Sequence, residues 1–351
     1  MYLEGLSNLY NKIRQNYKEF IMDVFLHILF LVVGFLFLIK GADIFIVSSS
    51  SIAKKLKISP LVIGLTLVAF GTSLPELAVS FASSISARSQ GLTADIAMGN
   101  VIGSNMANLT LILGTSALIM PIAVHKAMRK REFPFIIMIT ILMTILAFFF
   151  QADYQIVWWE ALILLLAFAF YIYLMMKSKS VISEEPLPLL DIKKAIILLI
   201  IGIVGVALGG YLATNGAEFI AIELLTKAFD MEVSKATTLV GLSIVALGTS
   251  LPELVTSAVA AKKGEADIAL GNVLGSNVFN ILLILGLSGL IVPLGINKDV
   301  MMDMFLLLGV TSFTVILGYT KNKISKLDGI LLLITYFAYI IYIVLRALSL
   351  I

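Results

Sequence analysis

The chain has 351 residues and a net charge of only +3, and with 60% hydrophobic and 13% charged residues it is too apolar for a soluble globular protein, in which about 25% of residues are charged. The absence of cysteine excludes disulfides, thiolate metal sites and thiol catalysis, and two histidines, His27 and His125, are too few for a histidine metal centre. Apolar runs of about 20 residues, the length that crosses a bilayer as a helix, recur along nearly the whole chain. The composition therefore indicates an all-α, multi-pass membrane protein.

Ten membrane helices are predicted in chain order, after an N-terminal tail (residues 1–22) without a secretory signal pattern. The tail is expected to be a short extension or an interfacial helix. A polar linker, residues 177–193, joins a first five-helix half (residues 23–176) to a second (residues 194–351). The predicted helices are residues 23–47, 60–86, 95–120, 133–150, 157–176, 194–226, 236–261, 266–293, 301–320 and 328–349.

Basic residues alternate between the two ends of the predicted helices. Sixteen Lys and Arg residues lie in the connections that follow odd-numbered helices, and five lie in the other connections and the C-terminal end. The positive-inside rule places the basic connections in the cytoplasm. The linker is then cytoplasmic, both termini lie outside the cell, and the protein is expected in the cell membrane.

Two sequence blocks occur twice, once in each half. GLTLVAFGTSLPEL at residues 64–77 matches GLSIVALGTSLPEL at residues 241–254. ADIAMGNVIGSNMANLTLILG at residues 94–114 matches ADIALGNVLGSNVFNILLILG at residues 266–286. Because each half holds an odd number of helices, the second half enters the membrane from the opposite side. The repeats are therefore predicted to be inverted, with matching segments facing each other near the midplane.

Each copy of GTSLPE places one carboxylate, Glu76 or Glu253, inside an apolar stretch. A carboxylate within hydrocarbon is costly and is by default a functional-site hypothesis. The repetition predicts two half-sites that meet.

Both copies also predict a broken helix. Pro75 and Pro252 each remove a backbone donor and clash with the preceding turn. The carbonyls of Ala69 and Ala246 are then expected to be freed and to face a cavity. Irregular backbone at membrane depth is tolerated only where it is buried in protein or lines a watery cavity.

Hydroxyl and amide side chains are spaced to share faces with one another. On a helix, Thr72 and Ser73 precede Glu76 by four and three residues, which places all three on one face. In the second block, pairs of hydroxyl and amide lie four residues apart: Ser104 with Asn108, and Ser276 with Asn280.

These groups are all hard oxygen donors, without sulfur or imidazole, which argues against zinc, copper and iron. Ca²⁺ takes six to eight oxygens at about 2.3–2.6 Å in a flexible shell, whereas Mg²⁺ demands near-ideal octahedral geometry. Two carboxylates neutralise one Ca²⁺, and several Na⁺ ions can use the same oxygens. Competition for shared ligands is a physical route to antiport.

The two blocks resemble the repeated motifs of the cation/calcium exchanger superfamily, and within it those of the prokaryotic sodium/calcium exchangers. The resemblance rests on both GTSLPE blocks and both GN-x-x-GSN-x-x-N blocks. It implies ten helices in inverted repeats, alternating access, and electrogenic export of Ca²⁺ driven by Na⁺. Ca²⁺ and Na⁺ are then transported ions, and no cofactor is implied.

The resemblance also implies which residues bind ions. Glu76 and Glu253 match the central shared metal ligands. The other implied Ca²⁺ or Na⁺ ligands are Thr72, Thr249, Ser73, Ser250, Ser104, Ser276, Asn108, Asn280 and the backbone of Ala69 and Ala246. Family members that co-transport K⁺ carry Asp where this chain has Asn280, so exchange independent of K⁺ is expected.

Three alternatives stay open. A Ca²⁺/H⁺ exchanger of the same superfamily is the nearest, because glutamates also bind protons. An intramembrane aspartyl protease would need aspartates, and neither central acid is Asp, so the chain is not expected to be an enzyme. A passive channel conflicts with the small residues that predict tight helix packing. Beyond the lipid bilayer, no nucleic-acid or protein partner is expected.

Overall fold

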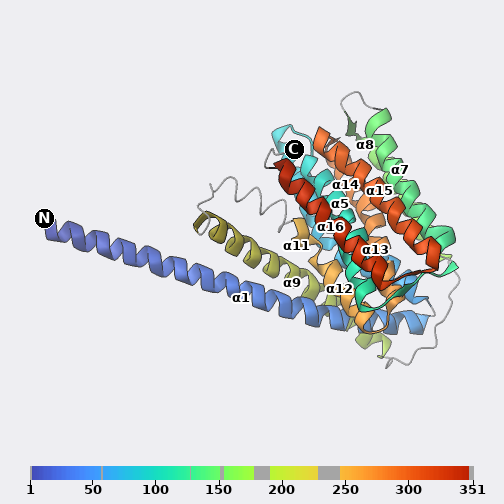
Figure 1. Cartoon of the computed structure of the whole chain (residues 1–351), viewed down its shortest axis with the longest axis horizontal. Coiled ribbons are helices and arrows are strands. Elements are labelled where there is room, and N and C mark those ends of the chain that lie inside the picture. The colour runs from blue at the N-terminus through green and yellow to red at the C-terminus, as the bar shows by residue number, and fades with distance from the viewer. Residues whose placement is uncertain are drawn as a thin grey trace.

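The computed structural model describes residues 2–56, 58–126, 128–150, 154–177, 190–227 and 246–347, with side chains described from residue 22 onward except those of Ala246 and Ala347. In these ranges the chain is almost wholly helical, and Figure 1 shows a helical bundle from which α1 projects. The α-helices are α1 (Tyr2–Leu56), α2 (Pro60–Ile63), α3 (Ala69–Thr72), α4 (Leu74–Gln90), α5 (Asp95–Ala107), α6 (Leu113–Ile119), α7 (Phe133–Phe149), α8 (Trp158–Met176), α9 (Ile192–Lys227), α11 (Ala246–Thr249), α12 (Leu251–Lys262), α13 (Ala266–Val278), α14 (Leu285–Ile291), α15 (Lys298–Lys321) and α16 (Lys326–Ala347). Four π-helical turns are η1 (Gly64–Val68), η2 (Asn108–Ile112), η3 (Met128–Glu132) and η5 (Phe279–Ile284).

Up to nine segments of the described chain are long and apolar enough to cross a membrane. Eight are unbroken: Met22–Leu56, Asp95–Ile119, Met128–Phe149, Trp158–Met176, Ile192–Lys227, Ala266–Ile291, Lys298–Lys321 and Lys326–Arg346. The ninth is a helix pair, Pro60–Thr72 and Leu74–Gln90, bent by 48°. These segments confirm an all-α polytopic membrane protein. The predicted helix at residues 236–261 is described only from residue 246, so the number ten stays a prediction.

The first helix is much longer than predicted. Instead of a tail followed by a helix at residues 23–47, α1 is one uninterrupted helix from Tyr2 to Leu56. The first proline of the chain is Pro60, so no residue before it removes a backbone donor. The helix therefore runs until the Ser59-Pro60 step starts α2, where the Ser59 hydroxyl accepts the N–H of Val62 at 3.3 Å.

The first helices of the two halves, α1 and α9, pack against each other backbone to backbone. A Cβ atom added to Gly41 would lie 2.7 Å from the backbone nitrogen of Val206, and one added to Gly202 would lie 2.8 Å from Cα of Phe45. Rising residue numbers in α1 meet falling numbers in α9, so the two helices are antiparallel. Antiparallel first helices are what inverted repeats require. In hydrocarbon, such glycine contacts let dispersion hold helices together.

Two short antiparallel strand pairs also join the halves. β1 (Ile122–Ala123) pairs with β4 (Lys323–Ile324), and β2 (Gln155–Ile156) pairs with β3 (Leu294–Gly295). β1 and β3 each follow the second repeated block of their own half, and β2 and β4 each precede its last helix. Each pair thus takes one strand from each half, and the repeat relates one pair to the other.

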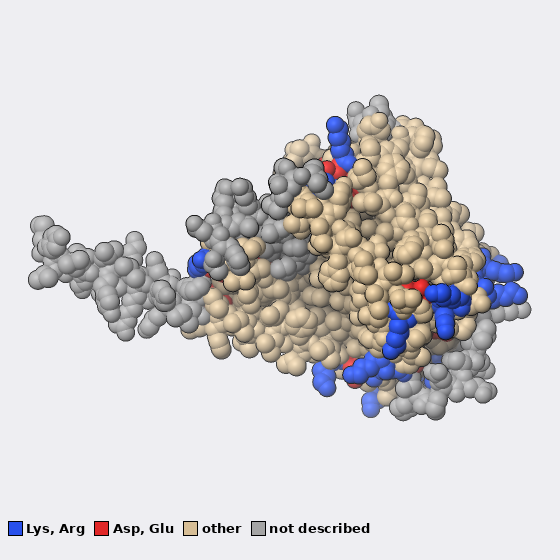
Figure 2. All heavy atoms as spheres, viewed as in Figure 1, with Lys and Arg blue, Asp and Glu red and all other residues tan. Residues whose placement is uncertain are grey.

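The predicted basic connections lie at one side of the molecule. Figure 2 shows a broad uncharged surface with Lys and Arg gathered mainly toward one end. Contacts join the five connections to one another or to the helix ends beside them: Lys55 Nζ to Asp191 Oδ1 at 3.6 Å, Lys263 Nζ to Asp43 Oδ1 at 2.8 Å, His125 Nε2 to Asp267 Oδ1 at 3.2 Å, and the pairing of β1 with β4. A backbone N–H of Lys193 donates to Asp191 and lowers the pKa of that carboxyl group.

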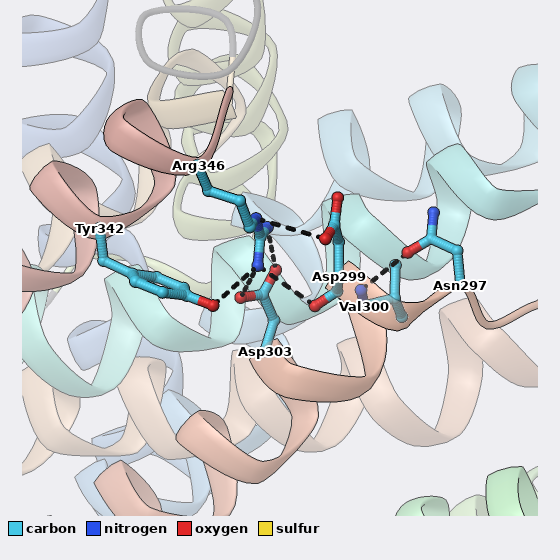
Figure 3. Close-up of polar contacts among 6 residues, drawn as sticks. All are labelled: Asn297, Asp299, Val300, Asp303, Tyr342 and Arg346. Atoms are coloured by element: carbon cyan, nitrogen blue, oxygen red, sulfur yellow. Dashed lines mark hydrogen bonds and ion pairs between the residues drawn. The ribbon is translucent and has the colours of Figure 1, made fainter. Parts of the chain in front are cut away.

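At the opposite side, Arg346 fixes the end of α16 to the start of α15 (Figure 3). Its two terminal nitrogens donate to the carboxylate of Asp303 at 3.0 and 2.9 Å, and its Nε lies 3.7 Å from Asp299 Oδ1. The Tyr342 hydroxyl accepts a further bond at 3.3 Å. Such a bidentate pair gives both charges their partners at the edge of the membrane.

Replacing Arg346 by Ala should destabilise the protein, because it leaves Asp303 largely buried and unpaired. Loss of one partner of a fully buried pair costs roughly 3–5 kcal/mol, and less is expected here because the Arg346 side chain is 20% exposed. Thermal unfolding of detergent-solubilised protein measures the loss. Arg88→Ala, at an exposed position, is the matched control, and the double variant Arg346→Met/Asp303→Leu should recover stability. Wild-type melting of Arg346→Ala would contradict the assignment.

Candidate ion-binding site

The structure brings Glu76 and Glu253 together at the interface of the two halves. Each carboxylate is 1% exposed, although one lies on α4 and the other on α12. The Ser73 hydroxyl donates to Glu253 Oε1 at 3.0 Å, and the Ser250 hydroxyl donates to Glu76 Oε1 at 3.3 Å. Each half therefore holds the carboxylate of the other half through a repeat-related serine.

The predicted break occurs at these same serines. Ser73 has ψ 7° and Ser250 has ψ 2°, and each separates a four-residue helix from a longer one. Pro75 and Pro252 sit in the first turn of the longer helix, where a proline N–H is not needed. The break has an electrostatic consequence, because it places both glutamates in the first turn of a helix, where the backbone dipoles favour negative charge.

The expectation of freed carbonyls at this break is wrong for Ala69. Its carbonyl accepts the N–H of Ser73 at 3.0 Å. The reason is the position of the proline, since Pro75 withdraws its donor from Gly71, four residues earlier, and not from Ala69. In the second half, the Ser250 N–H bonds to Leu247 at 3.1 Å. A carbonyl has a second lone pair, so backbone ligation by Ala69 and Ala246 stays a prediction.

The threonines flank the carboxylates. The Thr72 side chain lies beside Glu253, and that of Thr249 lies beside Glu76, each across the interface of the halves. Thr72 is fully buried, and its hydroxyl lies 3.1 Å from Asn272 Oδ1.

The four predicted ligands of the second block are all buried, with at most 1% exposure: Ser104, Ser276, Asn108 and Asn280. Their elements surround the carboxylates, because η2 packs against α12 and α13, and η5 packs against α4 and α5. Asn280 Nδ2 donates to Asn105 Oδ1 at 3.1 Å.

Many oxygens of this region have no hydrogen-bond partner within the described part of the chain. Three repeat-related pairs are among them: Oε2 of Glu76 and of Glu253, the hydroxyls of Ser104 and Ser276, and Oδ1 of Asn108 and of Asn280. Buried polar atoms are nearly always hydrogen-bonded. Six uncommitted oxygens, in three repeat-related pairs, fit a cation that takes oxygen ligands.

Two features of the site were not predicted from the sequence. Asn108 begins a π-helical turn and Asn280 lies in another, and such turns recur at functional sites. No local sequence signal marks them.

Asn100 and Asn272 were also missed, although the second block repeats them. Asn100 Nδ2 donates to Ser80 Oγ at 3.0 Å, and Asn272 Nδ2 donates to Ser257 Oγ at 2.9 Å. Their identity in both copies was the available signal, but nothing in the spacing showed their partners.

Glycines hold the two halves in this register. A Cβ atom added to Gly271 would lie 2.7 Å from the carbonyl oxygen of Leu61, and one added to Gly275 would lie 2.6 Å from that of Leu65. Helix α13 of the second half thus packs directly on the broken helix of the first. Any larger residue there would push the half-sites apart.

Two inverted halves that contribute matching carboxylates, hydroxyls and amides to one buried site define a secondary transporter. Residues 26–177 and 194–345 each match the profile of the family described as sodium/calcium exchanger protein. The chain belongs to this family. Its members are exchangers and not enzymes, with Ca²⁺ and Na⁺ as substrates and no cofactor, which confirms these predictions.

Individual relatives agree with the family. The chain is 36% identical to "Putative antiporter CaxA" of Alkalimonas amylolytica, over 89% of this chain and 96% of that protein. It is 33% identical to "Sodium/calcium exchanger MaX1" of Methanosarcina acetivorans, over 89% and 97%. A solved structure of the sodium-calcium exchanger NCX_Mj superposes with a TM-score of 0.75 at 33% identity, covering 90% of this chain and 98% of that one. The resemblance to the prokaryotic exchangers is thereby confirmed.

Glu76→Gln and Glu253→Gln should each abolish Ca²⁺ transport while leaving the fold intact. Glutamine keeps an oxygen for the serine of the other half but removes a charge from the site. A loss of about 3 kcal/mol in cation binding corresponds to a factor of about 100. Uptake of ⁴⁵Ca²⁺ by reconstituted vesicles measures it.

The matched control is Glu160→Gln. Glu160 is fully buried too, but its Oε2 accepts the N–H of Val157 at 2.8 Å at the start of α8, outside the site. This variant should retain transport. Full Ca²⁺ transport by either central variant would refute the assignment of Glu76 and Glu253.

Proposed function

We propose that this protein is a K⁺-independent, electrogenic Na⁺/Ca²⁺ antiporter that exports Ca²⁺ with the Na⁺ gradient by alternating access. The carrying observation is the carboxylate pair. Glu76 and Glu253 each use Oε1 for a serine of the opposite half, and the Oε2 of each has no partner in the described chain. Two negative charges match the charge of one Ca²⁺.

Competition for these oxygens couples the two ions. The same carboxylates, hydroxyls and amide oxygens can bind Na⁺, so Na⁺ displaces Ca²⁺ from the site. An empty site with two buried, unpaired carboxylates resists switching, because buried charge is costly in a low dielectric. The site therefore changes its exposure only when a cation occupies it. Exchange is electrogenic if the Na⁺ charge moved exceeds the two charges of Ca²⁺, as the family resemblance implies.

The proposed independence of K⁺ is supported by Asn280, at the position where the resemblance implies Asp in members that co-transport K⁺. A neutral amide stands there, and its Nδ2 is engaged by Asn105. No cluster of three or more Asp, Glu, His or Cys residues that could hold a metal occurs among the described residues. Two acids, with no third, leave no excess negative charge for a co-transported K⁺.

The basic side of the molecule is assigned to the cytoplasm. The support is the contact network that joins all five basic connections on one side, together with the positive-inside rule. Both termini then lie outside the cell.

The second candidate is a Ca²⁺/H⁺ exchanger. It is favoured by the carboxylates, which bind protons as well as metal ions, and by the similarity to an antiporter whose name, CaxA, states no sodium. The many hydroxyl ligands and the sodium/calcium exchangers among the relatives favour Na⁺ coupling.

⁴⁵Ca²⁺ uptake into proteoliposomes distinguishes the two. Vesicles loaded with Na⁺ should take up Ca²⁺, and vesicles loaded with K⁺ or choline should not, because only Na⁺ competes for the site and leaves by it. Uptake should persist without K⁺ on either side and should respond to membrane potential. Uptake that is driven by a proton gradient without Na⁺ would establish the second candidate, and a requirement for K⁺ would refute the K⁺-independence.

The orientation can be tested because the chain has no cysteine. A single cysteine replacing Lys323, in the β1–β4 pair, should react with a membrane-impermeant maleimide only after cells are permeabilised. A cysteine replacing Lys298, exposed at the start of α15 on the opposite side, should react in intact cells. The reverse pattern would place both termini in the cytoplasm.

A further inference from the structure

Asn272 joins the two halves next to the carboxylate pair. On α13, its Nδ2 donates to Ser257 Oγ at 2.9 Å, and its Oδ1 accepts from Thr72 Oγ1 at 3.1 Å. Asn272, Ser257 and Thr72 are all fully buried. Ser257 belongs to the same half as Asn272, whereas Thr72 belongs to the other half.

A hydroxyl binds a cation through an oxygen lone pair, so its hydrogen must point to another acceptor. The hydroxyl of Thr72 also lies beside Glu253, but a cation held by both groups occupies that carboxylate. Three other acceptors then remain in reach: Asn272 Oδ1 at 3.1 Å, Val68 O at 3.2 Å and Ala69 O at 3.3 Å. The Ala69 carbonyl already accepts the Ser73 N–H. Asn272 offers the shortest of the three contacts and the acceptor that lies on the opposite half.

The amide of Asn272 is held in the orientation that this requires. Ser257 engages the nitrogen, which leaves the oxygen toward Thr72. Ser257 lies four residues after Glu253, one turn further along α12, so the amide is tied to the helix that carries a central carboxylate. The first half repeats the anchor, with Asn100 bonded to Ser80, four residues after Glu76.

We propose that Asn272 is a positioning residue for cation binding: it takes the hydrogen of the Thr72 hydroxyl and turns the lone pairs of that oxygen toward the ion. The inference rests on the proposed function, in which Thr72 is a cation ligand. Asn272 itself does not contact the ion in this arrangement. Its contribution therefore exists only while Thr72 carries a hydroxyl.

A double-mutant cycle between Asn272→Ala and Thr72→Val tests this dependence. The readout is the half-saturating concentration of the cation whose affinity Thr72→Val lowers, measured separately from the maximal rate of Na⁺-driven ⁴⁵Ca²⁺ uptake. Asn272→Ala should raise that concentration about 3- to 10-fold, the effect of one hydrogen bond, with a smaller change in maximal rate. In the Thr72→Val background it should have little further effect.

Asn277→Ala is the matched control. Asn277 lies on the same helix and is equally buried, but its Nδ2 donates to Val273 O at 2.7 Å within that helix. Any fold-change that it causes in the half-saturating concentration should be the same with and without Thr72→Val. Ser257→Ala is the second variant if Asn272→Ala does not fold, because it frees the amide and removes only one atom. It should weaken the same affinity by a smaller factor, again only while Thr72 is present.

The proposal would be overturned if the fold-change in half-saturating concentration caused by Asn272→Ala or Ser257→Ala were the same with and without Thr72→Val. It would also be overturned if Thr72→Val left the affinity for both Na⁺ and Ca²⁺ unchanged. Ca²⁺-induced thermal stabilisation of the purified variants gives a readout independent of transport. The outcomes distinguish failure of the proposed function from failure of the role proposed for Asn272. Absence of Na⁺-driven uptake in the wild type refutes the proposed function, whereas an active wild type with independent mutations refutes only the role of Asn272.

Discussion

Two buried carboxylates without a basic partner are the constraint on which the site depends. Glu76 and Glu253 are each 1% exposed, and in the described ranges neither forms an ion pair with Lys or Arg. Asp303, near the membrane edge, differs from them because it has a basic partner, Arg346, which binds it bidentately. Serine hydroxyls and helix N-terminal ends compensate the central charges only in part. The charge left uncompensated supports the proposed binding of a cation between the two carboxylates.

The broken helices satisfy this constraint and also the rules of the bilayer. A break in mid-membrane exposes backbone groups, which is tolerated only inside protein. Here the breaks fall at the buried residues Ser73 and Ser250, and Pro75 and Pro252 lie in the first turn of the helices that follow. The breaks therefore create two N-terminal ends where negative charge is favoured. The tight packing of Gly271 and Gly275 on the broken helix excludes lipid from the same region.

Inversion of the repeats turns two half-sites into one. The serine of each half bonds to the glutamate of the other, so neither carboxylate is fully coordinated by its own half. In the proposed function, a cation that binds both carboxylates links the halves, and its departure removes that link. Asn272 adds a neutral link of the same kind, from the second half to Thr72 of the first. The proposed coupling between ion occupancy and the arrangement of the halves therefore uses the same few atoms.

The sequence by itself determined the membrane class, the repeats and the central residues, because apolar length, duplication and a carboxylate in an apolar run are local signals. It also located the break at Pro75 and Pro252. Only the tertiary structure decided which oxygens lack partners, since the hydrogen bonds that matter join residues some 200 positions apart. The same holds for the engaged carbonyl of Ala69, for the π-helical turns and for the contacts of Asn272. A residue's type fixes what it can donate or accept, but packing alone fixes what it meets.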